Sequence, residues 1–152
     1  MKDNITVKNL IPRCGSDILL PLMLMYMMYI ILHGHLSPGG GFQGGVLMVA
    51  VVAILYLGHG YETTARSLSA NLLHGSEGLA SVVYVALALM GVAVGAQFCQ
   101  NILYRQGAIG ELYSSGTIFW MNVTVGVKVL TGVGSIALLM VHVVNEYSER
   151  KE

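Results

Sequence analysis

Four long apolar runs constrain this chain more than any other feature of its sequence. They cover about residues 18–32, 41–57, 79–98 and 118–144 and leave little of the 152 residues for a soluble domain. A helix needs roughly 20 predominantly apolar residues to cross the hydrocarbon core of a bilayer. Backbone polar groups inside lipid must find partners within the protein, which helices provide. We therefore expect an all-α membrane protein with four transmembrane helices, built as one membrane domain over residues 1–152.

Composition and charge exclude several other classes of protein. Hydrophobic residues make up 55% of the chain and charged residues 11%. A soluble domain carries about 25% charged residues, so a soluble four-helix bundle is excluded. The first run is not expected to be a cleaved signal peptide, because it follows basic residues and no small-residue cleavage site precedes the next run. A formal net charge of zero argues against nucleic acid as a partner.

The basic residues outside the expected spans are distributed unevenly between the two sides of the membrane. Six of the seven lie on the side that holds both chain termini: Lys2, Lys8, Arg13, Arg66, Arg150 and Lys151. Arg105 alone lies on the other side, between the third and fourth runs. Basic residues accumulate in cytoplasmic loops. We therefore expect a multi-pass protein of the cytoplasmic membrane with both termini in the cytoplasm.

The connection between the first two apolar runs is rich in glycine. From His35 to Gly45 the sequence reads HLSPGGGFQGG. Gly40 and Gly44 are four residues apart, as are Gly41 and Gly45, and this doubled spacing lets two helix backbones approach closely in lipid. The stretch is not a phosphate-binding loop, because no Lys-Ser or Lys-Thr pair follows it.

Helix packing is the role expected for these small residues and for a similar pair in the third run. The expected packing residues are Pro38, Gly39, Gly40, Gly41, Gly44, Gly45, Gly91 and Gly95. Ser37 is expected to cap the second helix, with Pro38 in its first turn. In the next connection, the sequence from Glu62 to Leu68 permits a short interfacial helix.

Lys128 is the one formally charged residue inside an expected span. It lies about 10 residues from one end of the fourth run and about 15 from the other, too deep for its amino group to reach either surface fully. Burying an ionisable group in a membrane costs several kcal/mol, which makes such a residue a functional candidate. Two interpretations stay open: a place on a proton or ion path, and a structural contact with a carboxylate. The expected spans hold no carboxylate, so that partner would belong to another chain.

Four uncharged or titratable residues complete the candidate ion path: His35, Gln43, Asn122 and Thr124. His35 could take part in proton transfer or anchor the loop. Gln43 and Asn122 could hydrogen-bond across helices or line a wet cavity. Thr124 lies four residues before Lys128, on the same helical face.

No cofactor or metal site is predicted. The sequence has no nucleophile–base pair, no cysteine–histidine metal spacing and no cofactor fingerprint. Cys14 and Cys99 are expected on opposite sides of the membrane, so a disulfide cannot join them. His59 and His142 share an expected depth, as a haem-binding pair would, but both lie at the interface rather than inside the bundle. These observations favour a subunit of a larger assembly over a complete transporter or an enzyme.

The stretch from Gly34 to Gly45 resembles the signature of the B subunits of Mrp/Mnh-type multisubunit cation/proton antiporters. That signature typically reads Gly-His-x-x-Pro-Gly-Gly-Gly-Phe-x-Gly-Gly, and the likeness extends from about Leu10 to Val144. One departure lies in the fourth span, where many dedicated antiporter B subunits carry an aspartate and this chain has Lys128. The departure looks more like the versions in energy-converting complexes such as membrane-bound hydrogenases.

The resemblance implies a subunit of a complex that exchanges Na⁺ for H⁺, with no cofactor of its own. It implies other antiporter-like membrane subunits as partners and, in the energy-converting versions, a hydrogenase-like redox arm. Two alternatives stay open. The chain could be a structural anchor that joins antiporter-like subunits to a redox arm, or a membrane redox subunit that binds quinone or haem.

Overall fold

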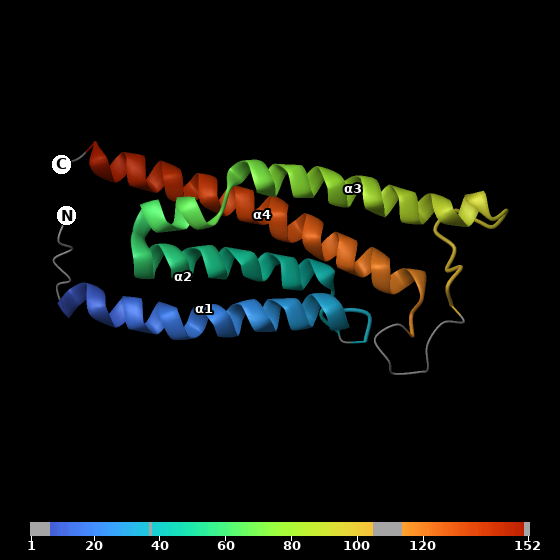
Figure 1. The fold of residues 1–152 in the computed structure, drawn as a ribbon, viewed down its shortest axis with the longest axis horizontal. Coiled ribbons are helices and arrows are strands. Elements are labelled where there is room, and N and C mark those ends of the chain that lie inside the picture. Colours follow the sequence, from blue (N-terminus) through green and yellow to red (C-terminus); the bar gives the residue numbers. More distant parts are fainter. Residues whose placement is uncertain (1–6, 37, 105–113, 151–152) are drawn as a thin grey trace.

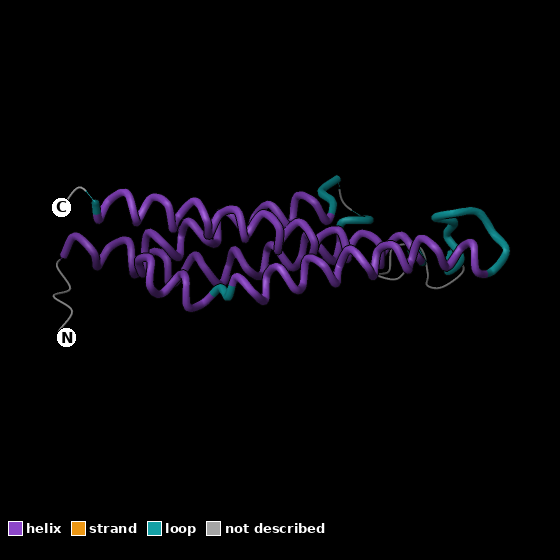
Figure 2. The backbone as a smooth tube through the Cα atoms, turned by 90° about the horizontal axis from the view of Figure 1, so that it is seen from above, coloured by secondary structure: helices purple, strands orange, loops and turns teal. Residues whose placement is uncertain are grey.

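Four long helices form the whole of the described fold. The computed structural model describes residues 7–36, 38–104 and 114–150. Its helices are α1 (Val7–His33), α2 (Gly41–Ser67), α3 (Ala70–Ala93) and α4 (Thr117–Glu149). Each is long and apolar enough to cross a membrane, and the described residues contain helices and loops without strands (Figure 2). The predicted all-α membrane fold with four spans is therefore confirmed.

The helices form an open row rather than a closed bundle. In space their order is α1, α2, α4, α3, so that α1 and α3 lie at opposite edges (Figure 1). Helix α4 packs extensively against both α2 and α3, whereas α1 packs against α2 and has only a minor contact with α4. We call the end where α1 begins and α4 ends the terminal end, and the opposite end the loop end (Figure 1).

Helix α2 is broken at Gly60. Its backbone there has φ 80° and ψ 177°, a conformation that favours glycine. Beyond the break, residues 61–67 form a short helix that turns back beside α4 before α3 begins (Figure 1). The hydroxyl of the fully buried Thr64 donates a hydrogen bond to the Gly60 carbonyl at 2.9 Å and stabilises the break. The short helix expected after the second span is therefore confirmed.

Two helix boundaries differ from the sequence prediction. The N-cap of α2 is Gly40, without a side-chain cap, so the expected start near Ser37 is wrong; Ser37 itself lies outside the described residues. Helix α3 begins at Ala70, not near residue 79, and ends at Ala93. The hydroxyl of its N-cap, Ser69, accepts a hydrogen bond from the Leu72 N–H at 3.5 Å. The first turns of α3 were missed because they carry polar residues, which lie beside α4 instead of in lipid.

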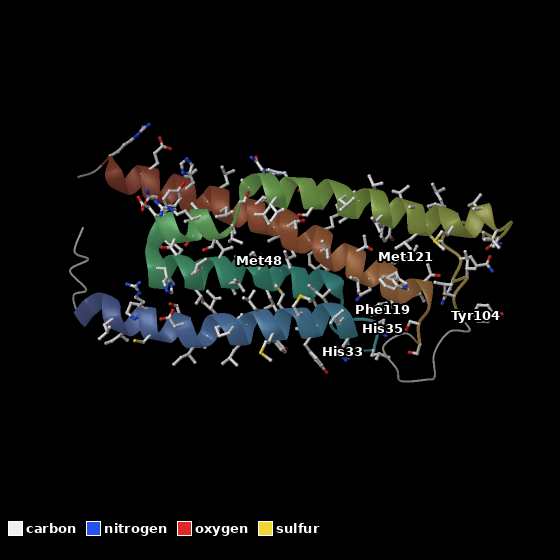
Figure 3. All side chains as sticks on the ribbon, viewed as in Figure 1. His33, His35, Met48, Tyr104, Phe119 and Met121 are labelled. Atoms are coloured by element: carbon white, nitrogen blue, oxygen red, sulfur yellow. The ribbon has the colours of Figure 1, made fainter. Side chains whose placement is uncertain are left out.

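The buried core joins α1, α2 and α4. It consists of Met27 and Ile31 of α1, Met48, Val51 and Val52 of α2, and Ala137 of α4. Figure 3 labels Met48 within this layer. Burial from water does not drive helices together inside lipid, so close van der Waals contact must do so. The residues that allow the closest contact are glycines.

Candidate functional site

Glycines let the backbones of α1, α2 and α4 touch near the loop end. A Cβ atom at Gly41 would overlap the backbone oxygen of Asn122 in α4. One at Gly45 would lie 2.7 Å from Cβ of Val129, and one at Gly44 would lie 2.6 Å from Cγ1 of Ile31 in α1. The close approach expected at these three positions is confirmed. We call Gly41, Gly44 and Gly45, with Gly126 of α4, the glycine seam.

Asn122 ties three helices together across this seam. Its Oδ1 accepts a hydrogen bond from the Gly41 N–H at 2.7 Å, and its Nδ2 donates one to the Ile31 carbonyl at 2.8 Å. These groups lie at the start of α2 and near the end of α1, where helices leave backbone groups unpaired. The expected hydrogen bonding of Asn122 across helices is confirmed, and both functions of its amide are used in packing.

The other candidates near the loop end make separate contacts. Both ring nitrogens of His35 are buried without a hydrogen-bond partner in the described chain, and its ring meets Phe119 edge-on at 5.3 Å (Figure 3). Gln43 is exposed. Thr124 is buried and donates to the Trp120 carbonyl of its own helix at 2.7 Å. The five predicted ion-path residues therefore do not form one cluster.

The remaining predicted packing residues have varied roles. Pro38 is exposed, and a Cβ at Gly40 would make only ordinary contact, 3.8 Å from Oδ1 of Asn122. A Cβ at Gly39 would lie 2.8 Å from Oε1 of Gln43. Gly91 is buried against the carbonyl of Gln97, in the turn that follows its own helix. Gly95 lies beyond α3 with φ 79° and open space around it, so it serves the turn rather than a helix interface.

Lys128 lies on the other flank of α4, facing α3. It borders a cavity of about 480 Å³, together with His74 and Glu77 of α3 and Gly132 of α4. The Glu77 carboxylate rests on Gly132, where a Cβ would lie 3.3 Å from Oε1. Lys128 is exposed in the isolated chain and Glu77 is half-buried. We call this cavity the charged groove.

Glu77 corrects one expectation from the sequence. The spans were expected to hold no carboxylate, so that any partner of Lys128 would belong to another chain. Because α3 begins at Ala70, Glu77 lies inside a helix able to cross the membrane, one helical turn along α4 from Lys128. Opposite charges at this spacing offset part of the cost of placing each one in a low-dielectric environment.

Polar side chains also link the helices at the terminal end. Nε2 of His59 lies 3.0 Å from Oδ1 of Asp17, which joins α2 to α1. Nδ1 of His142 lies 2.6 Å from the Tyr61 hydroxyl, which joins α4 to the short helix. Ser16 lies 3.4 Å from Nδ1 of His59, but it is buried and its hydroxyl donates to the Arg13 carbonyl at 2.8 Å. That donation commits its proton, so the cluster is a structural link and not a nucleophile with its base.

Sequence reasoning missed Glu77, His74 and the two histidine links, because each depends on neighbours far along the chain. One signal was available for Glu77. Gly132 lies four residues after Lys128 and therefore on the same helical face, which leaves room for a side chain of another helix. No group of three or more metal-ligating side chains occurs in the part of the chain that the structure describes.

The seam, the link through Asn122 and the placement of Lys128 all fall within one region that matches a known family. Residues 11–135 match the model described as a domain related to the MnhB subunit of Na⁺/H⁺ antiporters. The chain belongs to this family. The B-subunit family predicted from the glycine-rich stretch is thus confirmed, and the chain is a multi-pass membrane protein of that family.

Individual relatives agree with this assignment. The chain is 31% identical to protein MJ1307 of Methanocaldococcus jannaschii over 124 residues, which cover 78% of this chain and 47% of the relative. It is 29% identical to the MnhB-type subunit of the Na⁺/H⁺ antiporter of Bacillus subtilis over 66 residues, covering 43% and 46% of the two chains. It is 24% identical to mnhB2 of Staphylococcus haemolyticus over 147 residues, covering 92% and 94%.

A solved structure shares the fold. The chain superimposes with a TM-score of 0.71 and 30% identity on a chain of the membrane-bound sulfane sulfur reductase, an archaeal respiratory membrane complex. The match covers 92% of this chain and 60% of that one. The chain thus spans about half the length of the M. jannaschii and B. subtilis relatives and less than two thirds of the solved one.

Proposed function

We propose that this chain is a non-catalytic subunit of a multisubunit antiporter-like module and takes part in exchanging protons for Na⁺. The observation that carries the proposal is the charged groove. A charged side chain inside a membrane costs several kcal/mol, and an apolar contact between α3 and α4 would avoid that cost. A lysine and a carboxylate at this depth, in a member of the antiporter B-subunit family, favour a role in moving charge.

The open row of helices supports assembly with other membrane subunits. Only 17% to 33% of the most apolar window of each span is buried within this chain. The rest must face lipid or neighbouring proteins. The glycine seam keeps α1, α2 and α4 together while the outer faces of the row stay available for partners.

A link to a redox complex is part of the proposal. The similarity to a chain of an archaeal respiratory membrane complex supports a redox-coupled module over a stand-alone antiporter. The hydrogenase-like arm stays a prediction, because that solved complex is a sulfane sulfur reductase. The cytoplasmic membrane and the cytoplasmic side of both termini also stay predictions, which rest on the distribution of basic residues.

The test uses the whole complex purified through a tag on this chain. Antiporter-like subunits should co-purify, and sealed vesicles of the complex should show sodium-dependent proton movement. The Lys128→Met variant should assemble on a native gel but move protons at least tenfold more slowly. Arg13→Met, which removes a positive charge outside the groove, is the control and should behave like the wild type. A complex without antiporter-like subunits, or one that moves no protons, would contradict the proposal.

The structural-anchor alternative predicts a different result from the same experiment. As a pure anchor, the chain would tolerate Lys128→Met with full ion movement, while substitutions in the glycine seam would abolish assembly. A redox subunit would instead show a haem absorbance or a response to quinone-site inhibitors in the purified complex.

A further inference from the structure

Three cavities lie in succession beside α4, between the terminal end and Lys128. The first lies where the break in α2 meets the end of α4, and its titratable lining groups are His59, Tyr61, Glu62, His142 and Glu146. The third is the charged groove. The second lies between them, against the short helix and the start of α3.

Neighbouring cavities share the residues that line them. Tyr61 and His142 border both the first and the second, while His74 and Ser135 border both the second and the third. Their volumes are about 460, 410 and 480 Å³ in order, each enough for several water molecules. From His142 to Lys128 they follow about 21 Å of helix at 1.5 Å per residue. A titratable or hydroxyl-bearing side chain therefore stands at each junction between cavities.

The break at Gly60 accounts for the open space. The chain turns back at Gly60, and α3 begins only at Ala70, part-way along α4 (Figure 1). A short helix therefore flanks the last turns of α4, where a full span would close the gap. Leu68 and Ala70, on either side of the second chain reversal, line the second cavity. Irregular backbone inside a membrane is tolerated where it is buried in protein or borders water.

We propose that these cavities form a proton-conducting half-channel from the terminal end to Glu77 and Lys128. The proposal deepens the function above and rests on it. Titratable groups face the route from every helix that borders it. They are His59, Tyr61 and Glu62 from α2, His74 and Glu77 from α3, and Lys128, His142 and Glu146 from α4. Arg66 and Arg150 pair with the two entrance carboxylates, Glu62 and Glu146, at 3.6 and 3.4 Å.

The chemistry of the route favours protons over Na⁺. A hard cation such as Na⁺ binds best where several oxygen ligands surround it, by analogy with other oxygen-coordinated cations. The described residues contain no group of three or more metal-ligating side chains. The ammonium of Lys128 at the inner end would also repel a metal cation. Imidazole, phenol and carboxyl groups, in contrast, can each accept and release a proton.

Each proposed step transfers one proton and no electrons. A histidine can take up a proton on one ring nitrogen and release one from the other. His142, which is hydrogen-bonded to Tyr61 at 2.6 Å, would pass a proton through water to His74, and His74 to the Glu77 carboxylate. The carboxylate becomes neutral as the imidazolium loses its proton. The charge of Lys128 is then no longer offset, so the protonation states of the two residues depend on each other.

Thiol labelling tests whether water fills the route. Cys14 and Cys99 are replaced by serine in the whole complex, and Ser135→Cys is introduced between the second and third cavities. Leu79→Cys is the control, because Leu79 is exposed on α3 but lines none of the three cavities. A charged, membrane-impermeant methanethiosulfonate added on the terminal side should label Ser135→Cys at least tenfold faster than Leu79→Cys.

Slow labelling of Ser135→Cys, or labelling from the opposite side alone, overturns the half-channel. Ile136→Cys gives a second reporter if Ser135→Cys does not assemble, since Ile136 lines the same two cavities. This readout needs no ion movement. It therefore distinguishes failure of the half-channel from failure of the proposed function, which would appear as a wild-type complex that moves no protons.

A double-substitution cycle tests whether Glu77 and Lys128 conduct as well as pair. Glu77→Gln and Lys128→Met each leave one charge without its counter-charge, so each should lower the yield of assembled complex relative to the double variant. All three variants should move protons at least tenfold more slowly than the wild type. Recovery of proton movement in the double variant would show a purely structural pair and overturn the proposed end point.

Discussion

The glycine seam and the charged groove lie on two flanks of the same helix, and their construction is opposite. In the seam, facing α2, backbones are so close that a Cβ at Gly41 would overlap the Asn122 carbonyl. In the groove, facing α3, a lysine and a glutamate border about 480 Å³ of open space. Helix association in lipid depends on close packing and satisfied polar groups, which the seam supplies. The groove adds nothing to packing at several kcal/mol of cost, so its charges indicate function.

Enlarging a seam glycine should have the largest effect on assembly. Gly41→Leu places a side chain where the backbone of α4 already lies, so α2 and α4 must separate. Overpacking of this kind costs about 3 kcal/mol, or more when backbone blocks the way. We expect the complex to be lost from a native gel. Gly78→Leu is the matched control, because nothing lies within 4 Å of the Cβ position at Gly78. Normal assembly of Gly41→Leu would contradict the close approach of the two backbones.

Removing the amide of Asn122 should have the next largest effect. Asn122→Leu keeps the size of the side chain but leaves the Gly41 N–H and the Ile31 carbonyl without their partner. Unpaired polar groups in a dry environment cost about 1–3 kcal/mol each, so the midpoint of thermal unfolding in detergent should fall clearly. Gln43→Leu, which removes an exposed amide from α2, should leave the midpoint within about one degree. Equal midpoints for the two variants would show that the link through Asn122 is dispensable.

A small enlargement in the groove should have the smallest effect on stability and a selective effect on transport. A Cβ at Gly132 would lie 3.3 Å from Oε1 of Glu77, a side chain that can move aside. Gly132→Ala should therefore change the free energy of unfolding by less than about 1 kcal/mol. Displacing the carboxylate should still slow sodium-dependent proton movement several-fold in vesicles. A seam-like loss of assembly at this position would remove the distinction between the two flanks of α4.

Much of the membrane architecture could be predicted from local sequence. Apolar runs located four spans, and the spacing of Gly41 and Gly45 identified the face of α2 that meets α4. The third span was placed about nine residues too late, because polar side chains near its start were taken for a loop. His74 and Glu77 in fact lie beside α4 and not in lipid. Hydropathy alone cannot distinguish a polar residue in a loop from one in a helix that borders a cavity.

The candidate site was predictable only in part. Lys128 was identified because a charge inside an apolar run is conspicuous in any sequence. Its neighbour Glu77 lies 51 positions earlier, and nothing in the spacing of residues along the chain says that the two meet. Asn122 was expected to hydrogen-bond across helices, but its partners at Gly41 and Ile31 depend on how three helices are aligned.

The sequence by itself determined the number of spans, the glycine face of the second helix and the depth of Lys128. Each follows from periodicity and composition within one segment, which the backbone geometry of a helix converts directly into position. The tertiary structure decided that the helices stand in the order α1, α2, α4, α3, that the chain reverses at Gly60, and that Glu77 rests on Gly132 beside Lys128. Those outcomes depend on which helices become neighbours and in what register, and contacts between distant segments set both.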